Sequence, residues 1–175
     1  MHTGCVREYT NAMVEQGTFT GNRVEDYALA IRQGEALWER DLPLTSNLAN
    51  ISALLGQCLR RINWVGFYLW QEATSQLVLG PFQGLPACTR IAFGKGVCGT
   101  AVASHSTQLV ADVHEFSGHI ACDSASQSEI VIPIERNGAI LGVLDIDSPE
   151  KARFDLIDKE WLEKLVGVLV RLWPA

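Results

Sequence analysis

Two stretches of the chain have the pattern of a β-hairpin, and they constrain the fold more than any other feature. Apolar residues dominate positions 130–135 and 140–147, and the residues between them include Asn137-Gly138, a pair that favours the positive φ angles of a tight turn. Residues 62–70 and 76–81 flank a second turn, with the sequence Glu-Ala-Thr-Ser. Two hairpins predict an antiparallel sheet at the centre of the fold.

Three segments with helical spacing accompany the hairpins. The first runs from Glu25 and ends before Pro43, and the second is expected to begin with Thr45 or Ser46 as its N-cap. The third, residues 154–173, is amphipathic and closes the chain. Helices around two hairpins predict an α+β domain, in which a central antiparallel sheet is covered by helices.

The length and composition indicate one domain. The chain has 175 residues, of which 47% are apolar and 19% charged, so it can bury one sizeable core. Residues 1–22 are polar and have no sustained periodicity, which is typical of a variable or disordered tail. We therefore expect a tail over residues 1–22 and one domain over residues 23–175.

Charge and hydropathy restrict the partners. No apolar run reaches the roughly 18–20 residues that cross a bilayer, and the N-terminal region lacks the features of a secretory signal. We expect a soluble cytoplasmic protein with thiol rather than disulfide-framework cysteines, and no membrane partner. A net charge of -6 without a Lys/Arg cluster argues against nucleic acid as the main partner.

Three of the five cysteines, Cys88, Cys98 and Cys122, lie in residues 84–127, a long connection with little regular pattern apart from a short helix expected at residues 97–104. Cys98 begins that helix, where the helix dipole and Lys95 are expected to stabilise a thiolate. A single cysteine is more often a small buried hydrophobe, which is the interpretation we favour for Cys58 on its helix. The catalytic and the structural interpretation of the three loop cysteines both stay open at this point.

A metal site is the competing hypothesis for this Cys/His-rich loop. The spacings Cys-x9-Cys and Cys-x23-Cys match neither the paired Cys-x2-Cys nor the His-x3–5-His pattern of zinc modules. We therefore expect no metal, and we interpret His105 and His114 as surface residues or hydrogen-bonded loop residues.

Carboxylates and aromatic residues on the two hairpins form a second group of candidates. Asp145 and Asp147 are two apart in a strand and so project from one face, and Glu129 begins the partner strand. If the three acids converge, repulsion and burial raise at least one carboxyl pKa and create a proton donor. Trp64 and Tyr68, four apart, form an aromatic wall or ordinary core. A solvated strand end is the alternative for the acids.

Six short blocks occur along the chain in an order that is typical of one protein family. They are Asn63-Trp64-Val65-Gly66-Phe67-Tyr68, Leu79-Gly80-Pro81-Phe82-Gln83-Gly84, Phe93-Gly94-Lys95-Gly96-Val97-Cys98-Gly99-Thr100, Gly118-His119-Ile120-Ala121-Cys122-Asp123, Ser128-Glu129-Ile130-Val131 and Gly142-Val143-Leu144-Asp145-Ile146-Asp147. In these blocks the sequence resembles the free methionine-(R)-sulfoxide reductases, which are single-domain GAF proteins. The resemblance runs from about residue 25 to the C-terminus.

The resemblance implies roles for the candidate residues. Cys122 corresponds to the nucleophile, Cys88 to the principal resolving cysteine and Cys98 to an additional cysteine able to join disulfide exchange. The substrate-binding positions are Trp64, Tyr68, Glu129, Asp145 and Asp147. The implied reaction reduces free methionine (R)-sulfoxide through a cysteine sulfenic acid and an intramolecular disulfide, thereby protecting against oxidative damage.

The same resemblance implies thioredoxin or a similar dithiol as the reductant, with no cofactor, and it leaves a homodimer open. Two alternatives remain at this stage. GAF domains also act as modules that sense small molecules, and the same cysteines could form a redox switch without turnover. Steady consumption of a sulfoxide distinguishes an enzyme from both.

Overall fold

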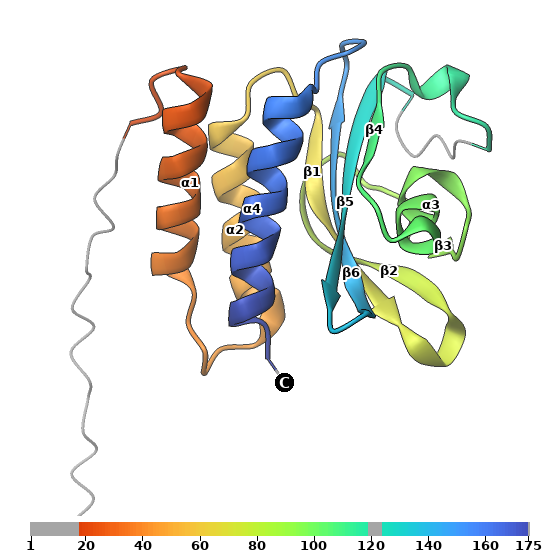
Figure 1. Ribbon diagram of the computed structural model, residues 1–175, viewed down its shortest axis with the longest axis horizontal. Helices are drawn as coiled ribbons and strands as arrows, with labels where there is room; N and C mark the ends of the chain where they lie inside the picture. The colour runs from red at the N-terminus through yellow and green to blue at the C-terminus, as the bar shows by residue number, and fades with distance from the viewer. Residues whose placement is uncertain (1–17, 119–123, 175) are drawn as a thin grey trace, which may run out of the picture.

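The computed structural model describes residues 18–118 and 124–174, and its centre is an antiparallel sheet in the order β3-β2-β1-β6-β5-β4 (Figure 1). The strands are β1 (Trp64–Gln71), β2 (Gln76–Gly84), β3 (Arg90–Ala92), β4 (Gln108–Val110), β5 (Ser128–Arg136) and β6 (Ala139–Ser148). Strands β1 and β6, one from each hairpin, pair at the centre of the sheet. The predicted α+β fold with a central antiparallel sheet is confirmed.

Both predicted hairpins are present, and their turns have the expected backbone. Asn137 and Gly138 join β5 to β6 with φ angles of 54° and 80°, the positive values that the Asn-Gly pair favours. The first hairpin closes through the 3-10 turn η1 (Glu72–Thr74), followed by Ser75 in the left-handed region. These turns set the register within each hairpin, of β1 with β2 and of β5 with β6.

Helices α2 (Leu44–Cys58) and α4 (Leu156–Leu172) cover one face of the sheet, and α1 (Arg23–Leu37) packs on the outer side of these two helices (Figure 1). The N-cap predicted for α2 at Thr45 or Ser46 is wrong, because the helix already begins at Leu44 and is preceded by Pro43. Proline fixes φ near the helical value, here -54°, and so starts the helix without a side-chain cap.

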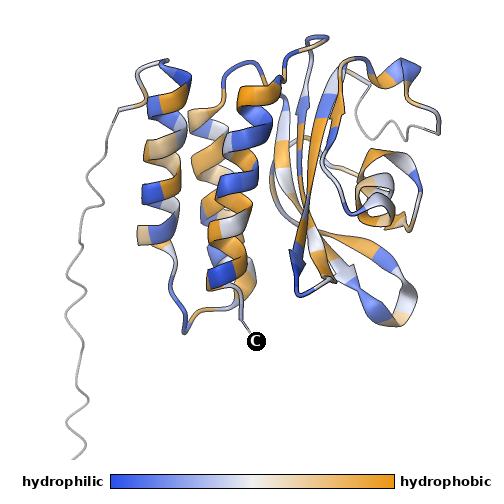
Figure 2. Cartoon of the chain, viewed as in Figure 1, coloured by the Kyte–Doolittle hydropathy of each residue, from blue (hydrophilic) through white to orange (hydrophobic). Residues whose placement is uncertain are grey.

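The pleat of the strands divides the apolar residues between two faces. Val65, Phe67 and Ile146 point toward the helices, where they join the main core, and all three are almost completely buried. In Figure 2 the central strands are largely orange, while blue and orange alternate along the helices. The helices therefore bury one face of each hairpin. The opposite face can be covered by another part of the chain.

The opposite face is covered by the segment between β2 and β5. This segment contains the helix α3 (Gly96–Ser104), the 3-10 turn η2 (Val113–Glu115) and the two short edge strands. The expectation that α3 is the only regular element here is wrong, because β3 and β4 each pair with a longer strand. A strand of three residues is too short for its alternation to be recognised in a sequence.

The residues before α1 pack onto the domain. The backbone N–H groups of Thr20 and Gly21 both donate to the carboxylate of Asp26, each at 2.7 Å, and Phe19 contacts the main core. None of the helices in the described part of the chain is long and apolar enough to span a membrane.

Candidate active site

The register of three strands brings the predicted pocket residues together. Asp147 of β6 lies between Trp64 on β1 and Glu129 on β5, and Asp145 lies opposite Gly66. All of these positions belong to the face away from the three helices. The prediction that Asp145 and Asp147 share a face is confirmed, and their neighbour on β5 is Glu129.

Gly66 provides the space for the aromatic side chains of this face. A Cβ atom at Gly66 would lie 2.3 Å from Cβ of Phe82 and 2.8 Å from Cη2 of Trp64. The Trp64 ring stacks on Phe82, with centroids 5.3 Å apart, and on Tyr68, at 5.9 Å. A larger residue than glycine would therefore displace the aromatic wall.

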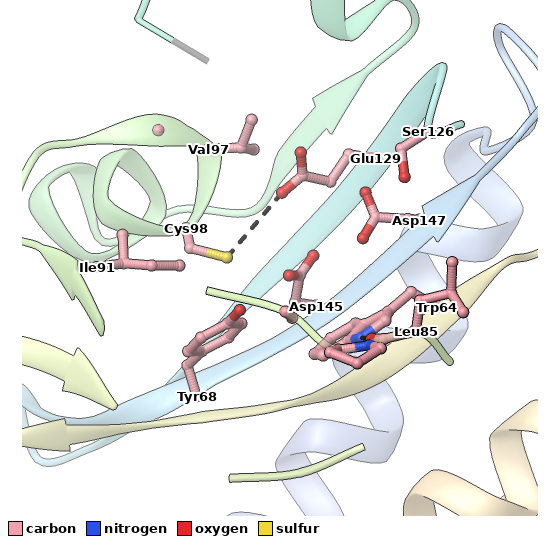
Figure 3. Close-up of a pocket in the computed structure, with 13 residues that line it drawn as sticks. Trp64, Tyr68, Leu85, Ile91, Val97, Cys98, Ser126, Glu129, Asp145 and Asp147 are labelled. Carbon is pink, nitrogen blue, oxygen red and sulfur yellow. Dashed lines mark hydrogen bonds between the residues drawn. The ribbon is translucent and has the colours of Figure 1, made fainter. Parts of the chain in front are cut away.

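A cavity of about 40 Å³ lies between this face and the segment that covers it (Figure 3). The residues that line it are Trp64, Tyr68, Leu85, Pro86, Ala87, Ile91, Gly96, Val97, Cys98, Ser126, Glu129, Asp145 and Asp147. A cavity of this volume holds a few water molecules. The five predicted substrate-binding residues and Cys98 all line it.

The two aromatic residues also fix the chain segment at the mouth of the cavity. The indole N–H of Trp64 donates to the carbonyl oxygen of Leu85 at 3.1 Å, and the hydroxyl of Tyr68 donates to that of Cys88 at 3.0 Å. Leu85 itself is 61% exposed. These two side chains thus form an apolar wall, and their polar atoms hold residues 85–88 against the sheet.

The carboxyl groups of Glu129 and Asp145 are almost completely buried, each with 6% of the residue exposed. Burial and the nearby aspartates raise the pKa of Glu129 well above its ordinary value. Burial also raises the pKa of Asp145, to about 6, although hydrogen bonds from Cys98 and Glu129 act in the opposite direction. Both carboxyls therefore hold their protons to higher pH than ordinary carboxyls do, as expected when buried acids converge.

Cys98 lies at the start of α3, and its thiol is 4.0 Å from Oε1 of Glu129. Burial and the negative charges of Asp145 and Glu129 raise the pKa of this thiol well above its ordinary value. The predicted thiolate is therefore wrong. Only 3% of Cys98 is exposed and Lys95 points to solvent, so desolvation and the neighbouring acids outweigh the helix terminus.

The other cysteines differ in their surroundings. Cys88 is half-buried and disulfide-bonded, whereas Cys58 and Cys98 are free. Cys122, the predicted nucleophile, lies outside the described residues. Cys58 belongs to the core on the other side of the sheet, and burial raises the pKa of its thiol to about 12, so its predicted structural role is confirmed.

His105 and His114 have the surface positions that we predicted. The ring of His105 is 3.0 Å from the carboxylate of Glu135, and that of His114 is 2.9 Å from the carboxylate of Asp112. Both histidine side chains are more than half exposed. Neither lines the cavity.

Several lining residues, among them Ser126 and Leu85, were not predicted from the sequence. Ser126 is 4% exposed, and its hydroxyl accepts a hydrogen bond from the side-chain amide of Asn63 at 3.1 Å. A serine in a polar loop and a leucine after a strand have no distinctive pattern. Only the way the loop folds over the sheet brings them to the cavity.

Three possible metal ligands converge at one end of the cavity. The side-chain ligand atoms of Cys98, Glu129 and Asp145 all lie within 4.8 Å of one another. Among the residues that the structure describes, this is the one such group of histidine, cysteine and acidic side chains.

The antiparallel sheet with a cavity on one face defines a GAF domain, and the sequence profile of the GAF domain family matches residues 51–171. The free methionine-R-sulfoxide reductase of Escherichia coli (strain K12) is 51% identical over 151 residues, which cover 86% of this chain and 90% of that protein. The chain belongs to the free methionine-R-sulfoxide reductase family of GAF proteins. This confirms the family that the sequence blocks predicted.

Solved structures agree with this assignment. The fRMsr of Staphylococcus aureus in its reduced form superposes with a TM-score of 0.79 at 53% identity, covering 83% of this chain and 94% of that chain. The free methionine-R-sulfoxide reductase of Neisseria meningitidis in complex with its substrate has a TM-score of 0.79 at 44% identity, covering 83% and 87%.

Proposed function

We propose that this protein reduces free methionine (R)-sulfoxide to methionine, with thiols as the source of electrons. The observation that carries the proposal is the buried pair of Glu129 and Asp145 beside the aromatic wall of Trp64 and Tyr68. The similarity to reductases of this name supports the same substrate. Each part of the cavity suits one part of that substrate.

Glu129 is the proton donor in this proposal. A sulfoxide is a poor electrophile until its oxygen is protonated, so the reaction needs an acid that still holds a proton at neutral pH. Burial and the charge of Asp145 keep the proton on Glu129. Asp145 has the smaller rise in pKa, to about 6, which makes it the weaker candidate for this role.

The remaining groups of the cavity bind the amino acid. The carboxylates of Asp145 and Asp147 are suited to the substrate ammonium, since opposite charges attract strongly in a site that excludes water. The faces of Trp64 and Tyr68 are suited to the methyl and methylene groups next to sulfur. Inside a peptide chain the α-nitrogen is an uncharged amide, so an internal methionine sulfoxide should not be a substrate.

The proposed thiol chemistry has three balanced steps. The Cys122 thiolate attacks the sulfoxide sulfur while Glu129 protonates its oxygen. The hydroxyl then passes from the substrate sulfur to the Cys122 sulfur as the bond between the two sulfurs breaks, so methionine is released and Cys122 becomes a sulfenic acid. The Cys88 thiol then attacks this sulfur, which forms a disulfide and releases water. Thioredoxin or a similar dithiol reduces the disulfide and is itself oxidised. The disulfide at Cys88, with Cys58 and Cys98 free, supports this division of roles.

The contacts of residues 85–88 support the proposal that the disulfide form is the resting product of turnover. Trp64 and Tyr68 hold Leu85 and Cys88 of this segment against the sheet, at the mouth of a cavity with room for a few water molecules. Reduction of the disulfide should release this segment and let substrate bind.

Turnover with the two diastereomers of free methionine sulfoxide tests the proposal. With a dithiol reductant, the (R) form should be converted to methionine, whereas the (S) form and a peptide sulfoxide should not. Cys122→Ser should abolish turnover, and Cys88→Ser should slow it and accumulate a sulfenic acid. Cys58→Ser is the matched control and should remain active. Binding without consumption of the sulfoxide would instead indicate a sensor or a redox switch.

The proton donor is tested by Glu129→Gln, which keeps the volume and removes the proton. Loss of a general acid typically lowers turnover by about 10²–10⁴-fold. Glu135→Gln on the same strand is the matched control, because Glu135 contacts His105 at the surface and should not matter. Near-normal turnover of Glu129→Gln at saturating substrate would exclude Glu129 as the acid.

A further inference from the structure

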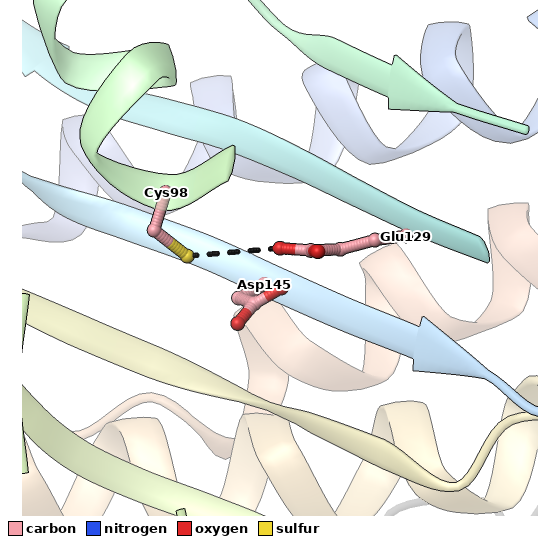
Figure 4. A group of neighbouring side chains, drawn as sticks. All are labelled: Cys98, Glu129 and Asp145. Atoms are coloured by element: carbon pink, nitrogen blue, oxygen red, sulfur yellow. Dashed lines mark hydrogen bonds between the residues drawn. The ribbon is translucent and has the colours of Figure 1, made fainter. Parts of the chain in front are cut away.

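Cys98, Glu129 and Asp145 come from three elements, α3, β5 and β6, and their side chains meet at the cavity (Figure 4). The thiol and the Glu129 carboxyl point toward each other, with Asp145 beside them. Exposed fractions of 3%, 6% and 6% mean that solvent hardly reaches these side chains. Their ligand atoms lie within 4.8 Å of one another, close enough to share one bound ion.

Among the described residues, one oxygen of this group has no hydrogen-bond partner. Oδ1 of Asp145 is buried and unpaired among the described residues, although Asp145 lines the cavity. A buried carboxylate oxygen without a partner is costly, so it indicates a cationic or hydrogen-bonding ligand at this place. A substrate ammonium could satisfy the oxygen, but it does not explain a thiol as the third member of the group.

We propose that Cys98, Glu129 and Asp145 bind a thiophilic divalent cation such as Zn²⁺, which inhibits the enzyme by occupying the substrate cavity. The inhibition rests on the proposed function, whereas the metal binding does not. On binding, the thiol proton and any carboxyl proton pass to solvent, and the bound state carries one thiolate and two carboxylates.

The donor set selects the type of ion. Zn²⁺ accepts sulfur at about 2.3 Å and carboxylate oxygen at about 2.0–2.2 Å, so tetrahedral ligands lie about 3.3–3.7 Å apart. The three atoms, which lie within 4.8 Å of one another, would have to move closer together to reach that spacing when the ion binds. Mg²⁺ and Ca²⁺ prefer oxygen alone, so the thiol discriminates against them. The fourth position faces the cavity.

A metal in this position removes two functions at once. The carboxylate of Glu129 would be a ligand and would no longer hold the proton that the sulfoxide needs. Asp145 would no longer be available for the substrate ammonium. We therefore expect inhibition that is competitive with substrate and is reversed by a chelator.

Titration of the oxidised protein tests the metal site directly. The protein should carry no histidine tag, contain Cys5→Ser and keep the Cys88 disulfide intact, so that Cys98 and Cys58 are the described free thiols. Calorimetry with Zn²⁺ should give one equivalent, and Mg²⁺ should give no measurable binding. Co²⁺ should produce the ultraviolet charge-transfer band of a thiolate ligand.

Variants then assign the ligands. Loss of a residue that only supports a metal ligand commonly lowers metal affinity by about 10–100-fold. Cys98 and Asp145 are proposed as direct ligands, so Cys98→Ser and Asp145→Asn should each weaken Zn²⁺ binding by at least about 100-fold. Cys58→Ser should bind as the parent does.

Each failure has its own meaning. Unchanged affinity in Cys98→Ser, or Co²⁺ binding without a thiolate band, would overturn the metal site. The Mg²⁺ comparison and the Co²⁺ spectrum need no variant, so the test holds even if Cys98→Ser does not fold. Zn²⁺ binding in a protein without reductase activity would refute the proposed function and leave the metal site standing.

Discussion

Replacing Asp145 by asparagine should stabilise the protein at neutral and alkaline pH while it impairs substrate binding. The folded protein holds a proton on Asp145 up to a pKa of about 6, against an ordinary value of 3.8. Because the folded state binds the proton more tightly than the unfolded chain, stability falls as the pH rises. The stability that comes from this tighter proton binding is fully present below about pH 4, and it is lost as the pH passes through about 6.

The magnitude follows from the two pKa values. At about 1.4 kcal/mol for each pKa unit, the difference between 3.8 and about 6 corresponds to about 3 kcal/mol. The free energy of unfolding of Asp145→Asn, relative to that of the parent, should therefore rise by about 3 kcal/mol from pH 4 to pH 8. For a domain of this size that corresponds to about 6–12 °C in melting temperature.

Urea denaturation of the two proteins at several pH values between 4 and 8 measures this difference. Asp155→Asn is the matched control, because Arg23 holds the pKa of Asp155 well below its ordinary value. Asp155→Asn should be less stable than the parent at pH 8. The difference in their free energies of unfolding should become smaller at acid pH, where Asp155 of the parent is protonated. A stability difference for Asp145→Asn that does not vary with pH would refute the argument that burial strains this carboxylate.

Three further predictions concern the support of the site and of the fold. Tyr68→Phe should lower the stability of the oxidised protein by about 1 kcal/mol, because it removes the hydrogen bond to the carbonyl of Cys88. Urea denaturation measures this loss, and an equal loss in the reduced protein would contradict the prediction. Asp158→Asn should destabilise by about 3–5 kcal/mol in thermal denaturation, since it leaves Arg153 buried without its countercharge, and a change below about 1 kcal/mol would contradict it. Gly138→Ala should lower stability by about 1 kcal/mol or more, because its φ of 80° strains any side chain; unchanged thermal stability would show that the turn adapts.

Much of the fold could be predicted because its determinants are local. The Asn137-Gly138 pair specifies a turn, and the alternation on each side of it specifies two strands and their exposed faces. The edge strands β3 and β4 could not be recognised, since each has three residues and exists only by pairing with a longer neighbour.

The site could be predicted only in part. Side chains alternate along a strand, so Asp145 and Asp147 of β6 lie on one face. Once the register of the hairpin is known, it places Glu129 of β5 next to them. The environment of Cys98 could not be inferred in the same way. A helix start indicated a reactive thiolate, and the burial that reverses this appears only when α3 packs on the sheet. For the same reason no spacing in the sequence indicates a metal site, because its three ligands come from separate elements.

The two-residue turn at Asn137-Gly138 has a consequence for how this domain tolerates changes in length. Alternate residues of β5 serve different layers, so Glu129 faces the cavity and Ile130 faces the helices. One residue inserted into the turn would slip the pairing with β6 and exchange these positions, placing a carboxyl in the apolar core and an isoleucine in the cavity. Only a bulge, such as the irregularity between Ile134 and Glu135, could absorb the insertion. We expect loop grafts and peptide insertions to be accepted elsewhere on the surface and rejected at this hairpin.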